Sequence, residues 1–407
     1  MTTPHRDTLG RALFVALVAG VIVGAGVTSL FAQQPPPTWK QGQPDAMKES
    51  TLAPVPQPPA PLAAEKIQLN KIKVPPGFKV ELWAAGISNA RAMTMGSKGT
   101  MFVSSRVVGN VYALVDKGSK REVKVIAKGL DIPNGVAFRD GALYVAAQNR
   151  ILKYEGIEDK LDNPGEAVIV IDSLPKHQPH GWKYLAFGPD GKLYFNIGAP
   201  GNIVMPPETN ANISRINADG TGFEYVARGV RNSVGFDWHP VTKELYFTNH
   251  GRDWLGEDLP NDTLHQVSGR NVPHFGYPFC HQGDILDPDF GKGHACSEFS
   301  PPLLKLGPHV APIGMIFYTG NMFPPQYKNR IFIAQRGSWN RTQKLGYGVT
   351  TVTLAMGQPP VQEGFASGWL ENNQPWGRPA YLFQMPDGSL LVSDDYAGAI
   401  YRISYSR

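Results

Sequence analysis

One short pattern recurs six times between residues 67 and 406. Each copy has an apolar run rich in β-forming residues, a tight turn that is often Asp-Gly, and a second apolar run. A third run follows after a short polar break. Asp-Gly between two such runs is a strong hairpin signal, because the turn needs residues that accept a positive φ. The copies begin at Ala92, Gly135, Leu185, Gly235, Gly314 and Tyr381.

Repetition of one hairpin indicates a fold assembled from equivalent units. Six similar β units around an axis form a β-propeller, and the 44 glycines and 36 prolines favour many turns between short strands. We therefore expect an all-β protein, a six-bladed β-propeller of four-stranded antiparallel blades, in residues 65–407. A β-sandwich is the alternative, although it would not require copies of one hairpin signature.

Two segments of different character precede the repeats. An apolar run at residues 12–32 follows Arg6 and Arg11. It is typical of a secretory signal peptide and is also long enough to span a bilayer. We expect residues 1–32 to be a signal peptide or membrane anchor, so that the folded domain is periplasmic or secreted, with a tether to the inner membrane if the segment is retained. Residues 33–64 are rich in Pro, Gln and Ala, a composition typical of a linker without a core.

The two cysteines, Cys280 and Cys296, both lie in a long insertion between about Asp253 and Leu306. In an oxidising compartment such a pair is expected to form one disulfide, the alternative being two free thiols. The insertion is too long for a plain connection and is expected to be an ordered loop over one face. Its acidic residues Asp284, Asp287 and Asp289 lack EF-hand spacing, and we interpret them as part of a solvated loop.

Several classes of function lose support from the sequence. The formal charge of +5 is modest for 407 residues and includes no basic run, which disfavours a nucleic-acid partner. There is no Gly-x-Ser-x-Gly, His-Glu-x-x-His, P-loop or Gly-x-Gly-x-x-Gly motif, and this argues against hydrolase triads, zincin metal sites and nucleotide cofactors. Cys-x-x-Cys-His is also absent, so the chain attaches no c-type haem.

Polar residues stand beside the starts of the repeats. In a propeller these positions face the mouth of the central channel, where unpaired polar groups buried together would be costly. We expect them to converge on water, an anionic ligand or a metal. The alternatives are a backbone hydrogen bond for His180 and a salt bridge between blades for Arg231. The polar flanking residues are Asn134, His180, Arg231, Asn232 and Arg378, and Pro312 occupies the similar position before the fifth repeat.

Several of these positions lie in longer blocks that resemble the glucose/sorbosone dehydrogenase family of soluble quinoproteins. The longest block runs from His180 to Gly198, His-Gly-Trp-Lys-Tyr-Leu-Ala-Phe-Gly-Pro-Asp-Gly-Lys-Leu-Tyr-Phe-Asn-Ile-Gly. The resemblance covers residues 67–406 and is greatest to the sorbosone dehydrogenase branch, through residues 197–200 and 253–260. The other matching blocks are residues 229–235, 248–253, 337–341 and 377–379.

This resemblance implies a propeller that holds pyrroloquinoline quinone (PQQ) with a calcium ion. His180 corresponds to the base that takes the proton from the C1 hydroxyl of an aldose or a hydrated sugar aldehyde such as sorbosone, while hydride passes to the quinone. Arg231 corresponds to the group that stabilises the developing oxyanion. A neutral imidazole suits a base near pH 7, and a fixed guanidinium suits charge on oxygen. Electrons would then pass to a periplasmic acceptor such as a cytochrome or a quinone.

The resemblance also implies a set of cofactor ligands. Arg378 would bind a cofactor carboxylate, and the backbone carbonyls of Gly251 and Arg252 would hold the calcium. The remaining cofactor-binding candidates are Asn134, Asn232, His250, Trp339 and Arg341.

The chain also departs from the family pattern at two places. Ala199 replaces an aspartate of the glucose-oxidising members, which makes glucose a less secure substrate. Asp262-Thr263 stands where some members have an Asp-Glu pair for further calcium ions.

Two functions of other classes remain open. One is a calcium-dependent lactonase of the gluconolactonase type, because Pro133-Asn134-Gly135 resembles a metal-binding loop of those six-bladed enzymes. Such enzymes need side-chain carboxylates around the metal, whereas the expected site is rich in arginine. The other is a binding propeller without catalytic activity.

Overall fold

A computed structural model describes residues 37–406 except 59, 119, 178 and 270. The chain divides into two units, Met1–Pro36 and Pro37–Arg407. The expected signal peptide or anchor lies in the first unit, outside the described residues, and stays a prediction. Among the described residues no helix is long and apolar enough to cross a membrane.

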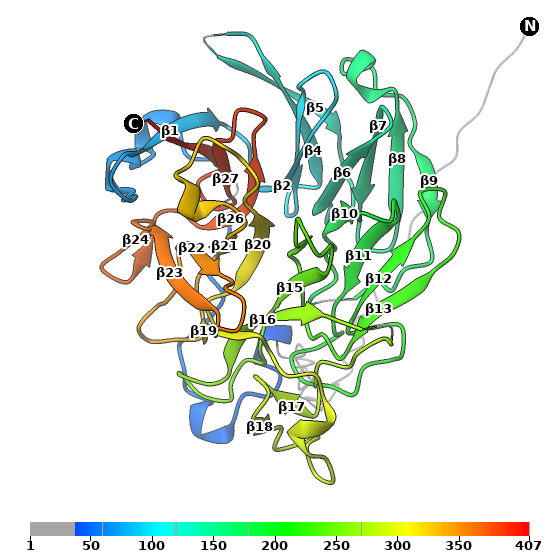
Figure 1. Ribbon diagram of the computed structural model, residues 1–407, viewed down its shortest axis with the longest axis vertical. Coiled ribbons are helices and arrows are strands. Elements are labelled where there is room, and N and C mark those ends of the chain that lie inside the picture. The colour runs from blue at the N-terminus through cyan, green and yellow to red at the C-terminus, as the bar shows by residue number, and fades with distance from the viewer. Residues whose placement is uncertain (1–36, 59, 119, 178, 270, 407) are drawn as a thin grey trace, which may run out of the picture. The chain divides into compact units, whose positions relative to one another are not determined.

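The second unit contains six four-stranded antiparallel sheets, which confirms the six-bladed propeller (Figure 1). In chain order, the first three blades are β2 (Ala90–Met95), β3 (Met101–Ser105), β4 (Asn110–Asp116) and β5 (Arg121–Ala127); β6 (Gly135–Arg139), β7 (Ala142–Ala146), β8 (Ile151–Glu155) and β9 (Val168–Ile171); and β10 (Leu185–Phe187), β11 (Leu193–Ile197), β12 (Asn212–Ile216) and β13 (Glu224–Arg228). The next two are β14 (Phe236–Trp238), β15 (Leu245–Asn249), β16 (Asn261–Val267) and β19 (Leu304–Pro308); and β20 (Pro312–Phe317), β21 (Ile331–Gln335), β22 (Gly348–Thr353) and β23 (Val361–Ala366).

The sixth blade joins the two ends of the propeller. It consists of β26 (Pro379–Gln384), β27 (Leu390–Asp394), β28 (Ala399–Tyr405) and, outermost, β1 (Phe78–Ala85). β1 pairs antiparallel with β28 from Phe78 opposite Tyr405 to Ala85 opposite Ala399. A strand from the start of the domain therefore completes the blade made by its end.

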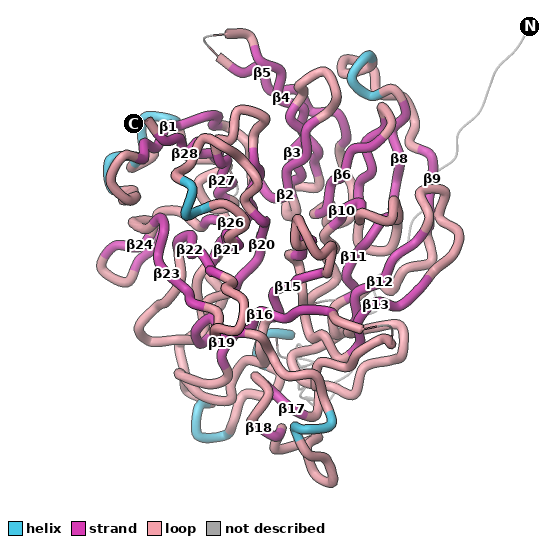
Figure 2. Tube along the Cα trace, in the orientation of Figure 1, coloured by secondary structure: helices cyan, strands magenta, loops and turns pink. Residues whose placement is uncertain are grey.

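Short elements connect the blades, and most of the remaining chain is loop (Figure 2). They are the 3-10 helices η1 (Thr38–Lys40), η2 (Asp45–Met47), η3 (Ala64–Lys66), η4 (Leu69–Lys71), η5 (Ile157–Asp159), η6 (Cys296–Glu298) and η7 (Pro325–Tyr327), and the small hairpins β17 (Cys280–His281)–β18 (Ile285–Leu286) and β24 (Leu370–Glu371)–β25 (Gln374–Pro375). The segment from Pro37 to Ala64, expected as a linker, contains η1, η2 and the start of η3, and part of it contacts the propeller.

The second strand of every blade is buried along its whole length. β3, β7, β11, β15, β21 and β27 have no residue that reaches solvent appreciably. Because both faces of such a strand pack against neighbouring blades, its sequence is a nearly continuous apolar run rather than an alternating one. This is why the repeats are visible in the sequence.

Glycines allow the inner strands to approach one another. β2 packs against β6 and β26, and β14 packs against β20. An ideal Cβ placed on Gly135 would lie 2.6 Å from the backbone nitrogen of Leu185, and one on Gly314 would lie 2.6 Å from the Cα of Tyr381. Neither contact is with a flexible side chain, so any larger residue would force neighbouring blades apart.

We expect Gly314→Ala to lower the free energy of unfolding by about 2 kcal/mol, because overpacking against backbone cannot be relieved by a rotamer change. Urea unfolding would measure the loss. Gly364→Ala on β23 is the matched control, since nothing lies within 4 Å of its Cβ position and the substitution only restricts the unfolded chain. Equal stability of the two variants would contradict this packing argument.

The insertion that contains both cysteines is shorter than the sequence predicted. Residues 261–267 form β16, a strand of the fourth blade, so the extra segment lies between β16 and β19. This strand was not predicted because Asp262, Thr263 and His265 are polar although they are buried.

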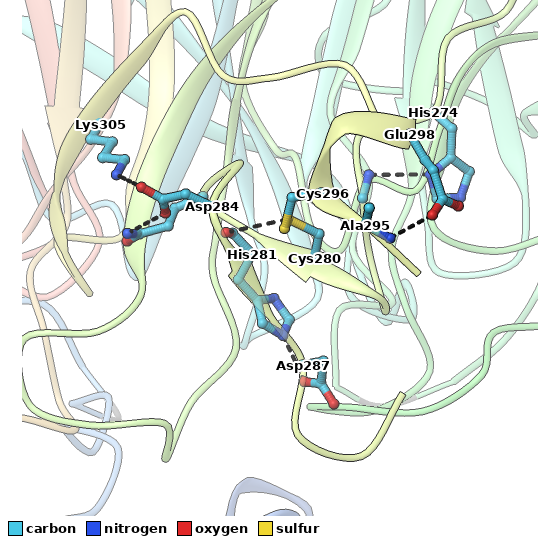
Figure 3. Close-up of a disulfide and its surroundings, with 11 residues drawn as sticks. His274, Cys280, His281, Asp284, Asp287, Ala295, Cys296, Glu298 and Lys305 are labelled. Carbon is cyan, nitrogen blue, oxygen red and sulfur yellow. Dashed lines mark hydrogen bonds and ion pairs between the residues drawn. A yellow bond between two sulfur atoms is a disulfide. The ribbon is translucent and has the colours of Figure 1, made fainter. Parts of the chain in front are cut away.

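The expected disulfide between Cys280 and Cys296 is present, with a Cα–Cα distance of 5.4 Å (Figure 3). Beside it, Asp287 is 2% exposed and lies 2.6 Å from both His281 Nε2 and Arg252 Nη1. The interpretation of Asp287 as part of a solvated loop is therefore wrong. Its charge is instead paired in the interior, as burial of a carboxylate requires.

Candidate functional site

A cavity of about 310 Å³ lies among the loops that precede the inner strands and those that follow the second strands. These two kinds of loop meet because the end of one antiparallel strand lies beside the start of its partner. Of the site residues predicted from the sequence, those that line it are His180, Arg231, Asn232, His250, Gly251, Trp339 and Arg378. Asp262, at which the chain departs from the family pattern, lines it as well.

His180 has a strained backbone conformation, and a hydrogen bond of its ring fixes the role of each ring nitrogen. Its φ is +53°, in the left-handed region that is uncommon for residues other than glycine. Nδ1 lies 2.9 Å from the carbonyl oxygen of Ala199. Because a carbonyl oxygen can only accept, Nδ1 carries the hydrogen and Nε2 keeps its lone pair. Gly198 leaves room for this loop, since a Cβ there would lie 2.6 Å from the His180 Cβ.

The electrostatic surroundings keep His180 neutral. Burial lowers the pKa of His180 well below its usual value, and the nearby positive charge of Arg231 lowers it further. Both influences disfavour the imidazolium form. Near pH 7 the ring is therefore a neutral imidazole with a free acceptor at Nε2.

The guanidinium of Arg231 is fixed by its neighbours. Nε donates to the carbonyl oxygen of Asn202 at 2.8 Å, and Nη2 donates to the Asn202 side-chain oxygen at 2.7 Å. Nη2 also lies 3.0 Å from Asp253 Oδ2. A group held in this way can stabilise charge without reorganising first. Sequence reasoning did not find Asn202.

Asn232 and His250 form an oriented pair. The Nε2 of His250 lies 3.1 Å from the carbonyl oxygen of Pro312 and therefore donates, which leaves Nδ1 to accept from Asn232 Nδ2 at 3.1 Å. Burial lowers the pKa of His250 to about 3, which keeps this ring neutral. The Asn232 side-chain oxygen is buried without a hydrogen-bond partner among the described residues. It is an acceptor available to a ligand.

The positive charge around the cavity is larger than the sequence indicated. Its lining includes Arg91, Arg106, Arg231, Arg336 and Arg378. Arg91 and Arg336 share one buried carboxylate, Asp395, at 2.7 and 2.6 Å. Burial would raise the pKa of Asp395, but the charges of Arg336 and Arg91 lower it to about 2. These two arginines are thus partly neutralised within the protein.

Arg106 and Arg378 have no carboxylate partner in the described part of the chain. Burial and the charges of neighbouring arginines lower the pKa of each to about 9. Arg378 donates to the carbonyl oxygens of Arg336 and Gly337, whereas Arg106 lies over the ring of Trp182 at 4.6 Å. Unneutralised guanidinium groups around a cavity favour a ligand with negative charge.

Three predicted residues do not place their side chains in the cavity. Asn134 is buried between blades, where it accepts from Arg91 Nε at 2.9 Å and donates to the hydroxyl of Tyr381 at 2.8 Å. Arg341 pairs with Asp258 at 2.7 Å. The side chain of Arg252 pairs with Asp287, and its predicted role concerns only its backbone carbonyl.

The cavity residues that sequence reasoning missed carry a recognisable signal. Arg91 precedes the first repeat as Arg231 precedes the fourth, and Arg106 and Arg336 directly follow the buried second strands β3 and β21, as His250 follows β15. Inspection of the position after each second strand would have identified Arg106 and Arg336. Among the described residues no group of three or more His, Cys, Asp or Glu side chains is placed to hold a metal ion.

Comparison with known proteins places the chain in a family. Residues 64–403 match the family described as "Domain of unknown function (DUF7133)". The chain belongs to this family. It is 34% identical over 362 residues to an "Uncharacterized protein" of Borreliella burgdorferi, covering 85% of this chain and 94% of that protein.

More distant relatives of this DUF7133 chain are named for an enzymatic activity. It is 24% identical to a pyrroloquinoline quinone-dependent pyranose dehydrogenase of Coprinopsis cinerea, spanning 87% of this chain but only 56% of that protein. The PQQ domain of a Coprinopsis cinerea pyranose dehydrogenase, solved in its holo form, superposes with a TM-score of 0.70 at 18% identity, covering 86% of this chain and 98% of the domain. The PQQ-bound aldose sugar dehydrogenase of Streptomyces coelicolor gives a TM-score of 0.58 at 18% identity, covering 82% and 100%. These two likenesses show that the chain has the fold of PQQ-dependent sugar dehydrogenases.

Proposed function

We propose that this protein is a PQQ-dependent oxidoreductase that oxidises an aldose or a sorbosone-like sugar aldehyde at C1. The observation that carries the proposal is the arrangement of the cavity. A neutral histidine with a free Nε2 and a fixed arginine share it with two arginines that lack a carboxylate partner among the described residues. A base, an oxyanion-stabilising group and an anion-binding surface are the parts that this chemistry requires.

The cavity residues fit this cofactor. Arg106 and Arg378 would bind its carboxylates, and Asn232 Oδ1 would accept from a donor on it or contact the associated cation. When bound, PQQ would supply the carbonyl that accepts the hydride. Gly251 lines the cavity, and its carbonyl with that of Arg252 would hold calcium, which prefers oxygen ligands.

The chain's own residues have distinct roles in this proposal. His180 Nε2 accepts the proton of the C1 hydroxyl, while the Nδ1–H bond to Ala199 holds the ring in orientation. Arg231 presents a fixed guanidinium to the oxygen on which negative charge develops. Asn202 and Asp253 keep that guanidinium in place, so their contribution is to positioning.

We also propose that the protein works outside the cytoplasm, in the periplasm or secreted, and passes electrons to a cytochrome or a quinone there. The disulfide supports this location because such bonds persist in oxidising compartments. The apolar run at residues 12–32 supports export, with a membrane tether if it is retained.

Reconstitution tests the proposal. Purified apo-protein would be titrated with PQQ and Ca²⁺ while its tryptophan fluorescence is followed, and then assayed for dye reduction with glucose, sorbosone and simple aldehydes. We expect saturable quenching and dye reduction with at least one of these substrates. Absence of both would overturn the proposal. Hydrolysis of a sugar lactone without dye reduction would support the lactonase alternative.

A further inference from the structure

Part of the proline-rich segment that was expected to be a linker also lines the cavity. Residues 38–57, here called the N-terminal strap and drawn in dark blue in Figure 1, line the cavity at two places. Thr38 and Trp39 line it first, and Pro54, Val55 and Gln57 line it again further along the chain. The strap therefore forms part of the cavity wall even though it belongs to no blade.

One end of the strap is held by hydrogen bonds and aromatic contacts. Trp254 Nε1 donates to the carbonyl oxygen of Trp39 at 2.7 Å, and the Trp39 ring lies against those of Trp254 and Trp339 with centroids 6.4 and 5.8 Å apart. Asn202 donates from its backbone to Gln41 Oε1 at 2.5 Å and from its side chain to the Gln41 carbonyl oxygen at 2.8 Å. At the other end the side-chain amide of Gln57 lies 2.9 Å from that of Asn89.

These contacts connect the strap to the proposed chemistry. Asn202 binds Gln41 with its nitrogens and Arg231 with its oxygens. Trp39 contacts Trp339, which lines the cavity. A displacement of the strap would therefore open the cavity wall and loosen a neighbour of Arg231.

The strap also limits the size of the cavity. With the strap in place the volume of about 310 Å³ is near the lower end of the range for small-molecule sites, and bound PQQ would occupy part of it. The residues between the two crossings are mostly exposed, so the strap is held in place mainly by the contacts at its two ends. An aromatic ring at this wall offers a flat apolar surface to the C–H face of a sugar ring.

We propose that the strap is the outer wall of the substrate site and that Trp39 determines substrate specificity by excluding sugars larger than a monosaccharide. This inference rests on the proposed function and extends it to a substrate class. Trp39 acts by occupying space next to the substrate and takes no part in proton or hydride transfer.

Trp39→Ala in the full chain tests the inference with two measurements. The first is the ratio of kcat/KM for a disaccharide to that for its monosaccharide, which we expect to rise roughly tenfold as the wall recedes. The second is amide hydrogen exchange at Asn202, which we expect to become faster although its partner Gln41 is unchanged, because the strap is less firmly seated. Trp39→Phe keeps an aromatic ring and should stay close to the wild type in both.

Lys48→Ala is the matched control within the strap. Its ammonium pairs with the exposed Asp45 at 2.8 Å, and Lys48 does not line the cavity, so neither measurement should change. An unchanged ratio in Trp39→Ala would overturn the assignment of specificity, and unchanged exchange at Asn202 would overturn the seating of the strap. If the wild type binds no PQQ and oxidises no sugar, the proposed function fails together with the specificity role, while exchange at Asn202 still decides whether the strap covers the cavity.

Discussion

His180→Ala should lower the turnover of sugar oxidation by about 10²–10⁴-fold while leaving the affinity for PQQ unchanged. The variant removes the lone pair of Nε2 and retains the arginines that would bind the cofactor. Stopped-flow reduction with excess sugar would measure the chemical step, and fluorescence titration would measure cofactor binding. Full turnover in a variant that still binds PQQ would refute the assigned base.

The pH dependence gives His180 a separate signature. The base works only as the neutral imidazole, and in the protein the pKa of His180 lies well below its usual value of 6.5 because of burial and the charge of Arg231. The rate should therefore persist as pH falls through 6.5 and decline only at lower pH, when the ring gains a proton. That acidic limb should be absent in His180→Ala. His177→Gln, in the same loop but outside the cavity lining, should keep both the limb and the rate.

Arg106→Gln should weaken the binding of PQQ on the order of 100-fold, the usual effect of losing one charge-assisted hydrogen bond. The same change should leave the apo-protein at least as stable as the wild type. Arg106 has no carboxylate partner among the described residues, and the charges of Arg91 and Arg336 oppose its own. Fluorescence titration and urea unfolding of the apo-protein would measure the two effects.

Arg121→Gln is a closely matched control for this prediction. Arg121 lies over the ring of Trp83 at 4.6 Å, the same distance that separates Arg106 from Trp182, but outside the cavity. It should leave PQQ affinity unchanged. Equal loss of affinity in both variants would show that Arg106 acts through general stability and would contradict a role in anion binding.

The architecture could be predicted from the sequence because its signals are local. Buried second strands produce apolar runs, and Asp-Gly turns mark the hairpins, so all six inner strands were located near Ala92, Gly135, Leu185, Gly235, Gly314 and Tyr381. β16 was missed because its buried residues Asp262, Thr263 and His265 are polar. β1 was missed because its partner β28 lies at the opposite end of the chain.

The site was predicted in part, for a similar reason. Four of the predicted site residues stand next to repeat starts, namely His180, Arg231, Asn232 and Arg378. A position next to a repeat start is expected to face the mouth of the central channel, so these residues could be predicted from the sequence. Arg106 and Arg336 reach the same cavity from the ends of second strands. Asn202 and Trp39 reach it through loop contacts between segments 161 residues or more apart in sequence. Such contacts produce no repeating pattern in the sequence, so they could not be predicted from a single sequence.

The pairing of β1 with β28 has a consequence for how the protein is made. The closing blade combines the first strand of the domain with the last. During synthesis β1 therefore stays unpaired until nearly the whole chain has left the ribosome. Contacts between such distant segments slow folding, and exposed strand edges promote association in the meantime. A chain that stops before Ala399 would leave β1 unpaired and the ring open, so premature termination would remove the closure of the entire domain rather than one blade.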